Sequence, residues 1–91
     1  MKPDDSWMVV EKGVNGKPFL WKNQATDKYV MIDIFEARSD RCYEVLAVDV
    51  NPLENDDAKG ATIGRGCSDK ANWIEAYEKA KRIADRYMSK H

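Results

Sequence analysis

The chain has 91 residues, enough for one modest hydrophobic core and too few for a second independent domain. Hydrophobic residues make up 43% and charged residues 34%, a balance that excludes an intrinsically disordered chain. Fifteen Lys and Arg stand against sixteen Asp and Glu, and the resulting net charge of −1 excludes a protein drawn to nucleic acid or lipid by its overall field.

The N-terminal part of the chain predicts a β-hairpin. Two runs of β-forming residues lie at 6–12 and 19–24. Asn15-Gly16 between them favours the positive φ angles of a tight turn. These two runs are therefore expected to pair as antiparallel strands.

Two longer strands are predicted in the middle of the chain. The segments 29–39 and 42–51 are rich in β-branched and aromatic residues and are separated by a short polar link. Pro52 cannot donate to a sheet ladder, so the second of them is expected to stop there. After the polar loop 51–60, residues 61–63 are expected to return briefly as an edge strand.

The C-terminal part predicts one long helix from Asp69 to about Met88. At about 100° per residue, its apolar side chains gather in one arc of the helix, which is expected to pack on the sheet. These side chains are Trp73, Ala76, Tyr77, Ala80, Ile83, Ala84, Tyr87 and Met88. The whole chain is thus expected to be one α+β domain, an antiparallel meander of about four strands with a C-terminal helix on one face.

Neither face of the predicted sheet is cleanly polar. Alternation along 29–35 sends Val30, Ile32 and Ile34 to one face and Tyr29, Met31, Asp33 and Phe35 to the other. One helix covers only one side of such a sheet, so the other side is expected either to contact a partner or to be closed by the chain's own loops as a second small core.

The first hypothesis for function is therefore a non-catalytic binding or assembly domain. It would use the sheet face that the helix leaves uncovered, for self-association or for a protein partner. Aromatic side chains supply much of the apolar area at interfaces. The candidate contact residues are Trp21, Tyr29, Phe35 and Tyr43.

The stretch "IGRGCSDKANW" at 63–73 supports two readings. In the first, Gly64 and Gly66 release the backbone from a strand, and Ser68 caps the helix that follows. In the second, the glycines and the free N–H groups of the helix start hold an anion such as a nucleic-acid phosphate. The candidate anion contacts are Arg65, Ser68 and Lys70, with Lys79, Arg82 and Arg86 further along the helix.

Strands followed by "GRGCSDK" and an Ala-rich helix resemble the C-terminal half of double-stranded RNA-binding domains. Gly64, Gly66, Ser68 and Lys70 match the family's G-x-G-x-S-x-K pattern, while Asp69 stands where the family has a lysine. The resemblance covers about residues 29–88. It implies a β-β-β-α topology and makes nucleic acid the second candidate partner.

Catalytic and metal chemistry find little support in the sequence. Cys67 next to Arg65 is a candidate reactive thiol, but the single histidine, His91, is the last residue and offers no base beside it. The acidic loop that includes Asp57 fails the EF-hand spacing and is expected to be a solvated turn. We expect no enzyme activity, no cofactor and no metal.

Location is predicted from the cysteines and from hydropathy. Cys42 and Cys67 do not make a disulfide framework, and Cys42 is expected to pack as a small buried hydrophobe. No apolar run approaches the roughly twenty residues of a membrane span. The expected location is the cytoplasm, with no membrane partner.

Overall fold

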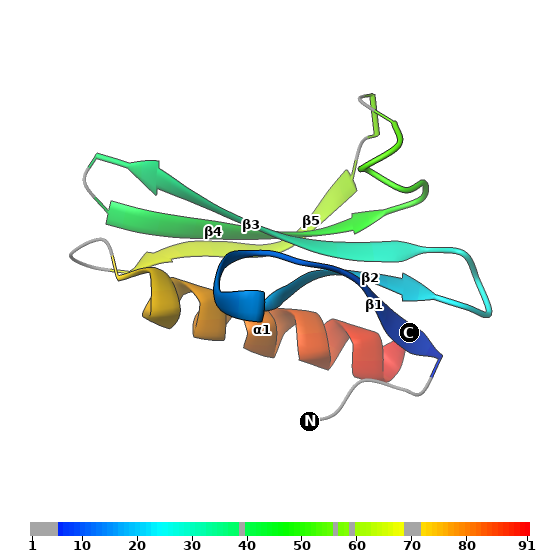
Figure 1. The fold of residues 1–91 in the computed structure, drawn as a ribbon. Coiled ribbons are helices and arrows are strands. Elements are labelled where there is room, and N and C mark those ends of the chain that lie inside the picture. Colours follow the sequence, from blue (N-terminus) through cyan, green and yellow to red (C-terminus); the bar gives the residue numbers. More distant parts are fainter. Residues whose placement is uncertain (1–5, 39, 56, 59, 69–71) are drawn as a thin grey trace.

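Five antiparallel strands form one sheet in the order β1-β2-β3-β4-β5, and one helix, α1, lies across one of its faces (Figure 1). The computed structural model describes residues 6–38, 40–55, 57–58, 60–68 and 72–91. The elements are β1 (Trp7–Lys12), β2 (Pro18–Asn23), β3 (Tyr29–Ala37), β4 (Asp40–Val48), β5 (Gly60–Ser68) and α1 (Trp73–Lys90). The predicted α+β meander with a C-terminal helix is confirmed, with five strands in place of about four.

The predicted β1–β2 hairpin is confirmed. Its turn is a short 3-10 segment, Val14–Gly16, in which Asn15 has φ 57° and Gly16 has φ 70°. Asn and Gly are the residues that adopt this left-handed conformation at least cost. The positive φ angles expected from the sequence thus lie where the chain reverses.

The fifth strand is longer than the sequence predicts. Instead of a brief return at 61–63, β5 pairs with β4 from Gly60 to Ser68, with one register shift opposite Val45 and Leu46. The stretch 64–68, read from sequence as a loop before the helix, is therefore strand. Pairing with β4 outweighed the local turn composition because it satisfies the backbone groups of β5 that face β4.

The helix begins later than predicted, and Ser68 is not its cap. Asn72 is the N-cap, and its side-chain oxygen accepts a hydrogen bond from the Glu75 N–H at 3.0 Å. Ser68 instead ends β5 with its side chain fully buried. The other two predicted helix-start residues, Asp69 and Lys70, lie outside the described residues.

The predicted apolar face of α1 packs against the sheet. Ala76, Ala80, Ala84 and Met88 are fully buried. The remaining members of the face, Trp73, Tyr77, Ile83 and Tyr87, belong to the core or pack against it. The sheet contributes Trp7, Trp21, Val30, Ile32, Tyr43 and Val45 to the same core. The run of alanines lets the helix approach the large aromatic side chains of the sheet closely.

A hydrogen bond from Tyr77 joins the helix to the turn end of the β1–β2 hairpin. The Tyr77 hydroxyl donates a 2.6 Å hydrogen bond to the carbonyl oxygen of Pro18. Burial, with a smaller contribution from the negative charge of Asp85, raises the pKa of Tyr77 from 10.0 to about 12. The neutral phenol is thus the form that the folded protein favours.

We expect this raised pKa to make the folded protein less stable between pH 10 and 12. Over this range Tyr77 ionises in the unfolded chain while it remains protonated in the folded one, so ionisation lowers the free energy of the unfolded state as the pH rises. Urea denaturation of the wild type and of Tyr77→Phe, across pH 8 to 12, checks this. The difference in stability between the two proteins should shrink above pH 10, and a difference that stays constant would contradict the assignment.

Among the residues that the structure describes, no helix combines the length and the apolar composition that crossing a bilayer requires.

Candidate functional site

The sheet face turned away from α1 has no helix over it among the residues that the structure describes, and we call it the open face. Its members follow from the strand register, because paired residues of neighbouring strands point to the same side. Val30, Ile32 and Val45 lie in the core under the helix. Their strand neighbours therefore point away from α1, as the alternation of the sequence predicts. Figure 1 shows the helix on one side of the sheet and the loop after β4 rising on the other.

The open face is arranged in rows that run across the strands. Phe35, Cys42 and Cys67 form the disulfide row. Asp33, Glu44 and Arg65 form the charged row next to it. Leu20, Met31, Leu46 and Thr62 form the apolar row. Lys22, Tyr29, Val48 and Gly60 form the terminal row.

Part of the open face is a second small apolar layer. Leu20 is fully buried, and Cys42 and Val48 are each 3% exposed, although no helix covers them. Around them, Tyr29, Met31 and Leu46 are half-buried, and Phe35 is 43% exposed. Some apolar side chains of the open face are thus closed by their neighbours, and others remain in contact with solvent.

The charged row separates two groups of apolar side chains. Asp33 on β3 and Arg65 on β5 are both exposed and lie on either side of Glu44 on β4. The Glu44 carboxylate accepts a 3.0 Å hydrogen bond from the hydroxyl of Thr62, in the apolar row. The acid on β3 and the base on β5 are therefore equally spaced about the central strand of this part of the sheet.

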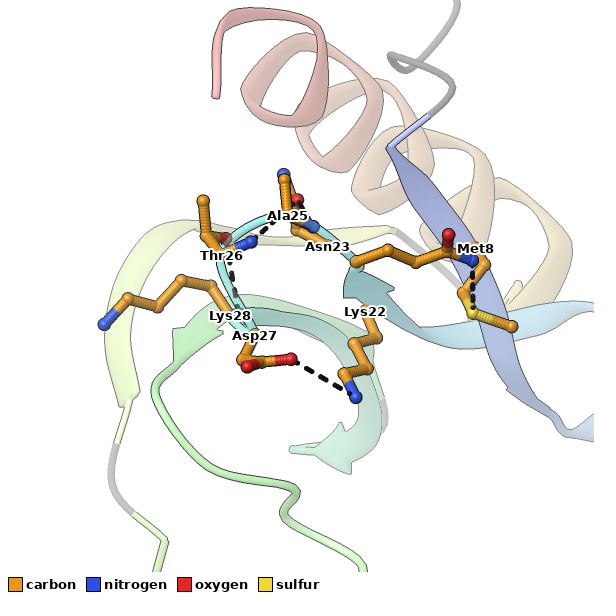
Figure 2. Close-up of polar contacts among 8 residues, drawn as sticks. Met8, Lys22, Asn23, Ala25, Thr26, Asp27 and Lys28 are labelled. Carbon is orange, nitrogen blue, oxygen red and sulfur yellow. Dashed lines mark hydrogen bonds and ion pairs between the residues drawn. The ribbon is translucent and has the colours of Figure 1, made fainter.

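The terminal row ends at the β2–β3 turn, whose polar groups make contacts within the turn and with neighbouring segments (Figure 2). The Asn23 side-chain oxygen accepts from the N–H groups of Ala25 and Thr26 at 2.8 and 3.2 Å. Lys22 pairs with Asp27 at 3.4 Å, and its ammonium lies 6.0 Å from the centre of the Tyr29 ring. These contacts shape the turn, and Lys28 within it pairs with Asp49 after β4 at 2.9 Å.

Two of the four predicted interface aromatics lie on the open face and two do not. Tyr29 and Phe35 belong to the open face. Trp21 and Tyr43 are buried in the core under α1, at 4% and 8% exposure, so their prediction as contact residues is wrong. Both faces of the strands are apolar, and the sequence does not reveal which of them the helix covers.

The predicted anion contacts are not brought together. Arg65 points from β5 to the open face, whereas Lys79, Arg82 and Arg86 lie on α1, which covers the opposite face. Lys79 pairs with Glu75 at 3.2 Å, and this hydrogen bond is the main reason why the pKa of Glu75 is lowered, with a smaller contribution from Ser68. Lys70 lies outside the described residues. The described cations thus occupy two sides of the molecule.

The glycines of the 63–73 stretch are explained by packing. A Cβ on Gly64 would lie 2.9 Å from Cδ1 of Ile83, on the helix. A Cβ on Gly66 would lie 2.5 Å from the hydroxyl oxygen of Tyr43, whose ring covers this position. Both distances are shorter than real Cβ atoms tolerate. The missing side chains thus make room for a helix and an aromatic ring on the core side of β5.

The two cysteines form a disulfide, which the sequence does not predict. Cys42 and Cys67 are directly opposite each other on β4 and β5, with 3.9 Å between their Cα atoms. Cys42 is buried as expected, but it is bonded to Cys67 instead of packing as a free thiol. Cys67 is exposed, and because it is part of the disulfide it is not the reactive thiol considered from the sequence. The expectation of a reducing location rested on the absence of a disulfide framework and loses that support.

Two cavities lie near the ends of the helix. A cavity of about 160 Å³ is lined by Phe19, Trp73 and Tyr77 among others, and one of about 270 Å³ by Trp7 and Tyr87 among others. Both are bordered by side chains that attach α1 to the sheet. Within the described part of the chain, no cluster of three or more His, Cys, Asp or Glu side chains could hold a metal ion.

Comparison of the chain with protein-family models, with curated proteins and with solved structures finds no match.

Proposed function

We propose that this protein is a non-catalytic assembly domain that forms a homodimer through the open face of its sheet. The observation that carries the proposal is the charged row, in which an exposed acid on β3 and an exposed base on β5 lie on either side of β4. Because the acid and the base lie on opposite sides of β4, two copies that face each other can each place their acid against the other's base. A second copy of the chain is therefore the partner whose chemistry fits the face.

The proposed dimer has its two-fold axis between the two sheets and parallel to β4. Such an axis places β3 of one copy over β5 of the other and keeps each row at the same level along the strands. Asp33 then faces Arg65 of the partner subunit, and this contact occurs twice. Phe35 faces Cys67 of the partner subunit, and the apolar rows pack on each other. Glu44 lies nearest the axis, and its carboxylate accepts the hydrogen bond from Thr62 of its own copy.

A charge exchange between two variants tests this arrangement. Asp33→Arg alone places arginine against arginine, and Arg65→Asp alone places aspartate against aspartate. Each single variant is expected to dimerise at least about tenfold more weakly than the wild type. An equimolar mixture of the two should form a heterodimer, because both contacts again join an acid and a base. Sedimentation velocity over a range of protein concentrations measures all three.

Charges on the opposite side of the molecule provide the matched control. Glu78→Arg and Arg82→Asp exchange the same charges on exposed positions of α1. These variants, alone or mixed, should associate as the wild type does. A wild type that remains monomeric at millimolar concentration would contradict the proposal, and so would single variants on β3 and β5 that dimerise normally.

The nucleic-acid hypothesis is separated by titration of labelled duplex RNA and single-stranded DNA. Phosphate contacts weaken steeply with salt, so binding through basic residues must fall between low and moderate ionic strength. Salt-dependent binding that Arg65→Ala abolishes without unfolding the protein would favour nucleic acid over a second copy. The described cations do not share one surface, and this is why we propose the homodimer.

A further inference from the structure

We propose that the Cys42–Cys67 disulfide is a thiol-exchange site at which a small thiol of the glutathione class becomes attached to Cys67. The two sulfur atoms differ in their surroundings. Cys67 is exposed on β5, whereas Cys42 is 3% exposed on β4. Exposed disulfides are the ones that exchange with external thiols, and the attack falls on the accessible sulfur.

The position of Cys67 at the edge of the sheet leaves a path for the attack. A thiolate must approach one sulfur along the line of the S–S bond, on the side away from the other sulfur. For Cys67 that line leads outward past β5, the last strand of the sheet. For Cys42 it leads over β3, where Phe35 is its direct neighbour. The fold therefore directs the thiol to Cys67.

The charges near Cys67 suit an anionic thiol. Arg65 is exposed, lies two residues before Cys67 and points to the same face. A nearby cation favours the thiolate form of an attacking thiol and attracts the carboxylates of a glutathione-like molecule. Glu44, the acid opposite Arg65, is bonded to Thr62. Arg65, on the same strand as Cys67, is thus the cation of this row that can attract an anionic thiol, while the acids of the row, Asp33 and Glu44, lie on β3 and β4.

The exchange step balances without another oxidant or reductant. The thiolate sulfur forms a bond to Sγ of Cys67, and the bond between the two cysteine sulfurs breaks. Its electron pair leaves on Sγ of Cys42, which then takes a proton from solvent. One external thiol is consumed and one cysteine thiol is formed. A second thiol molecule can then release Cys67 as a thiol, with formation of the external disulfide.

The test follows the attachment of glutathione by mass spectrometry, at protein concentrations too low for dimer formation. The wild type is treated with millimolar reduced glutathione in native buffer, quenched with an alkylating reagent and mapped by peptide. We expect glutathione on Cys67 and the alkyl group on Cys42. With glutathione disulfide, Cys42→Ser, which keeps the exposed cysteine, should react at least about tenfold faster than Cys67→Ser, which keeps the buried one.

Phe35→Ala tests why the thiol attacks Cys67 and not Cys42, since removing the ring opens the approach to the Cys42 sulfur. In this variant, glutathione should also appear on Cys42. Attachment mainly to Cys42 in the wild type would overturn the proposal, and so would exchange no faster than global unfolding measured by hydrogen exchange. The experiment measures the mass that glutathione adds to the monomeric protein, so its result does not depend on whether the protein dimerises. A further consequence rests on the proposed homodimer: glutathione on Cys67 would occupy the open face and prevent assembly.

Discussion

Loss of the Cys42–Cys67 disulfide is expected to lower the free energy of unfolding by about 3 kcal/mol. The bond joins residues 25 apart in the sequence, and closing a loop of this length lowers the conformational entropy of the unfolded chain and so raises its free energy by about that much. It also ties β5 to β4 close to the point where the chain leaves the sheet for α1. Urea denaturation of the oxidised protein, of the protein reduced by a phosphine, and of Cys42→Ala/Cys67→Ala measures the effect.

The two ways of removing the bond separate its contribution from that of packing. Reduction keeps both sulfur atoms in place, whereas the alanine variant also removes the buried side chain of Cys42. The alanine variant should therefore be destabilised by about 1 kcal/mol more than the reduced protein. A reduced protein as stable as the oxidised one would contradict this contribution of the disulfide.

Valine at Gly64 or at Gly66 is expected to destabilise the protein by about 2 kcal/mol. At Gly64 the new side chain meets Ile83 on the helix, and at Gly66 it meets the ring of Tyr43. Relieving either clash requires the helix or the ring to move within a closely packed core. Thermal or urea denaturation measures the loss, and the disulfide remains intact throughout.

Two controls show whether packing is the cause. Ala61→Val places the same side chain on the same strand at an exposed position and should change stability by less than about 0.5 kcal/mol. Ile83→Ala makes room opposite Gly64, so the double variant with Gly64→Val should be about 1 kcal/mol more stable than the sum of the two single effects predicts. Additive effects would mean that a side chain at position 64 does not clash with Ile83.

Much of the fold could be predicted because the signals are local. The periodicity of 73–88 identifies the buried face of α1, since a helix repeats its environment every 3.6 residues. Asn15-Gly16 marks the first turn because few other residues accept its φ angles. Alternation along β3 and β4 sorts their side chains correctly into two groups. Such features depend on a residue and its near neighbours, which the sequence displays directly.

The candidate site could be predicted only in part. Tyr29 and Phe35 were assigned to the same face correctly, but Trp21 and Tyr43 were placed with them although they lie under the helix. Both sides of the sheet carry apolar side chains, so composition does not tell which side is covered. The charged row emerges only once β3, β4 and β5 are aligned.

The sequence by itself determined the strands of the meander, the first turn and the apolar arc of the helix, because each is encoded by the spacing of neighbouring residues. The tertiary structure alone decided that 64–68 is a strand, that its glycines make room for Ile83 and Tyr43, and that Cys42 meets Cys67. These outcomes depend on the register between β4 and β5, in which residues about 25 positions apart become neighbours. Long-range pairing of this kind leaves no local pattern in the chain.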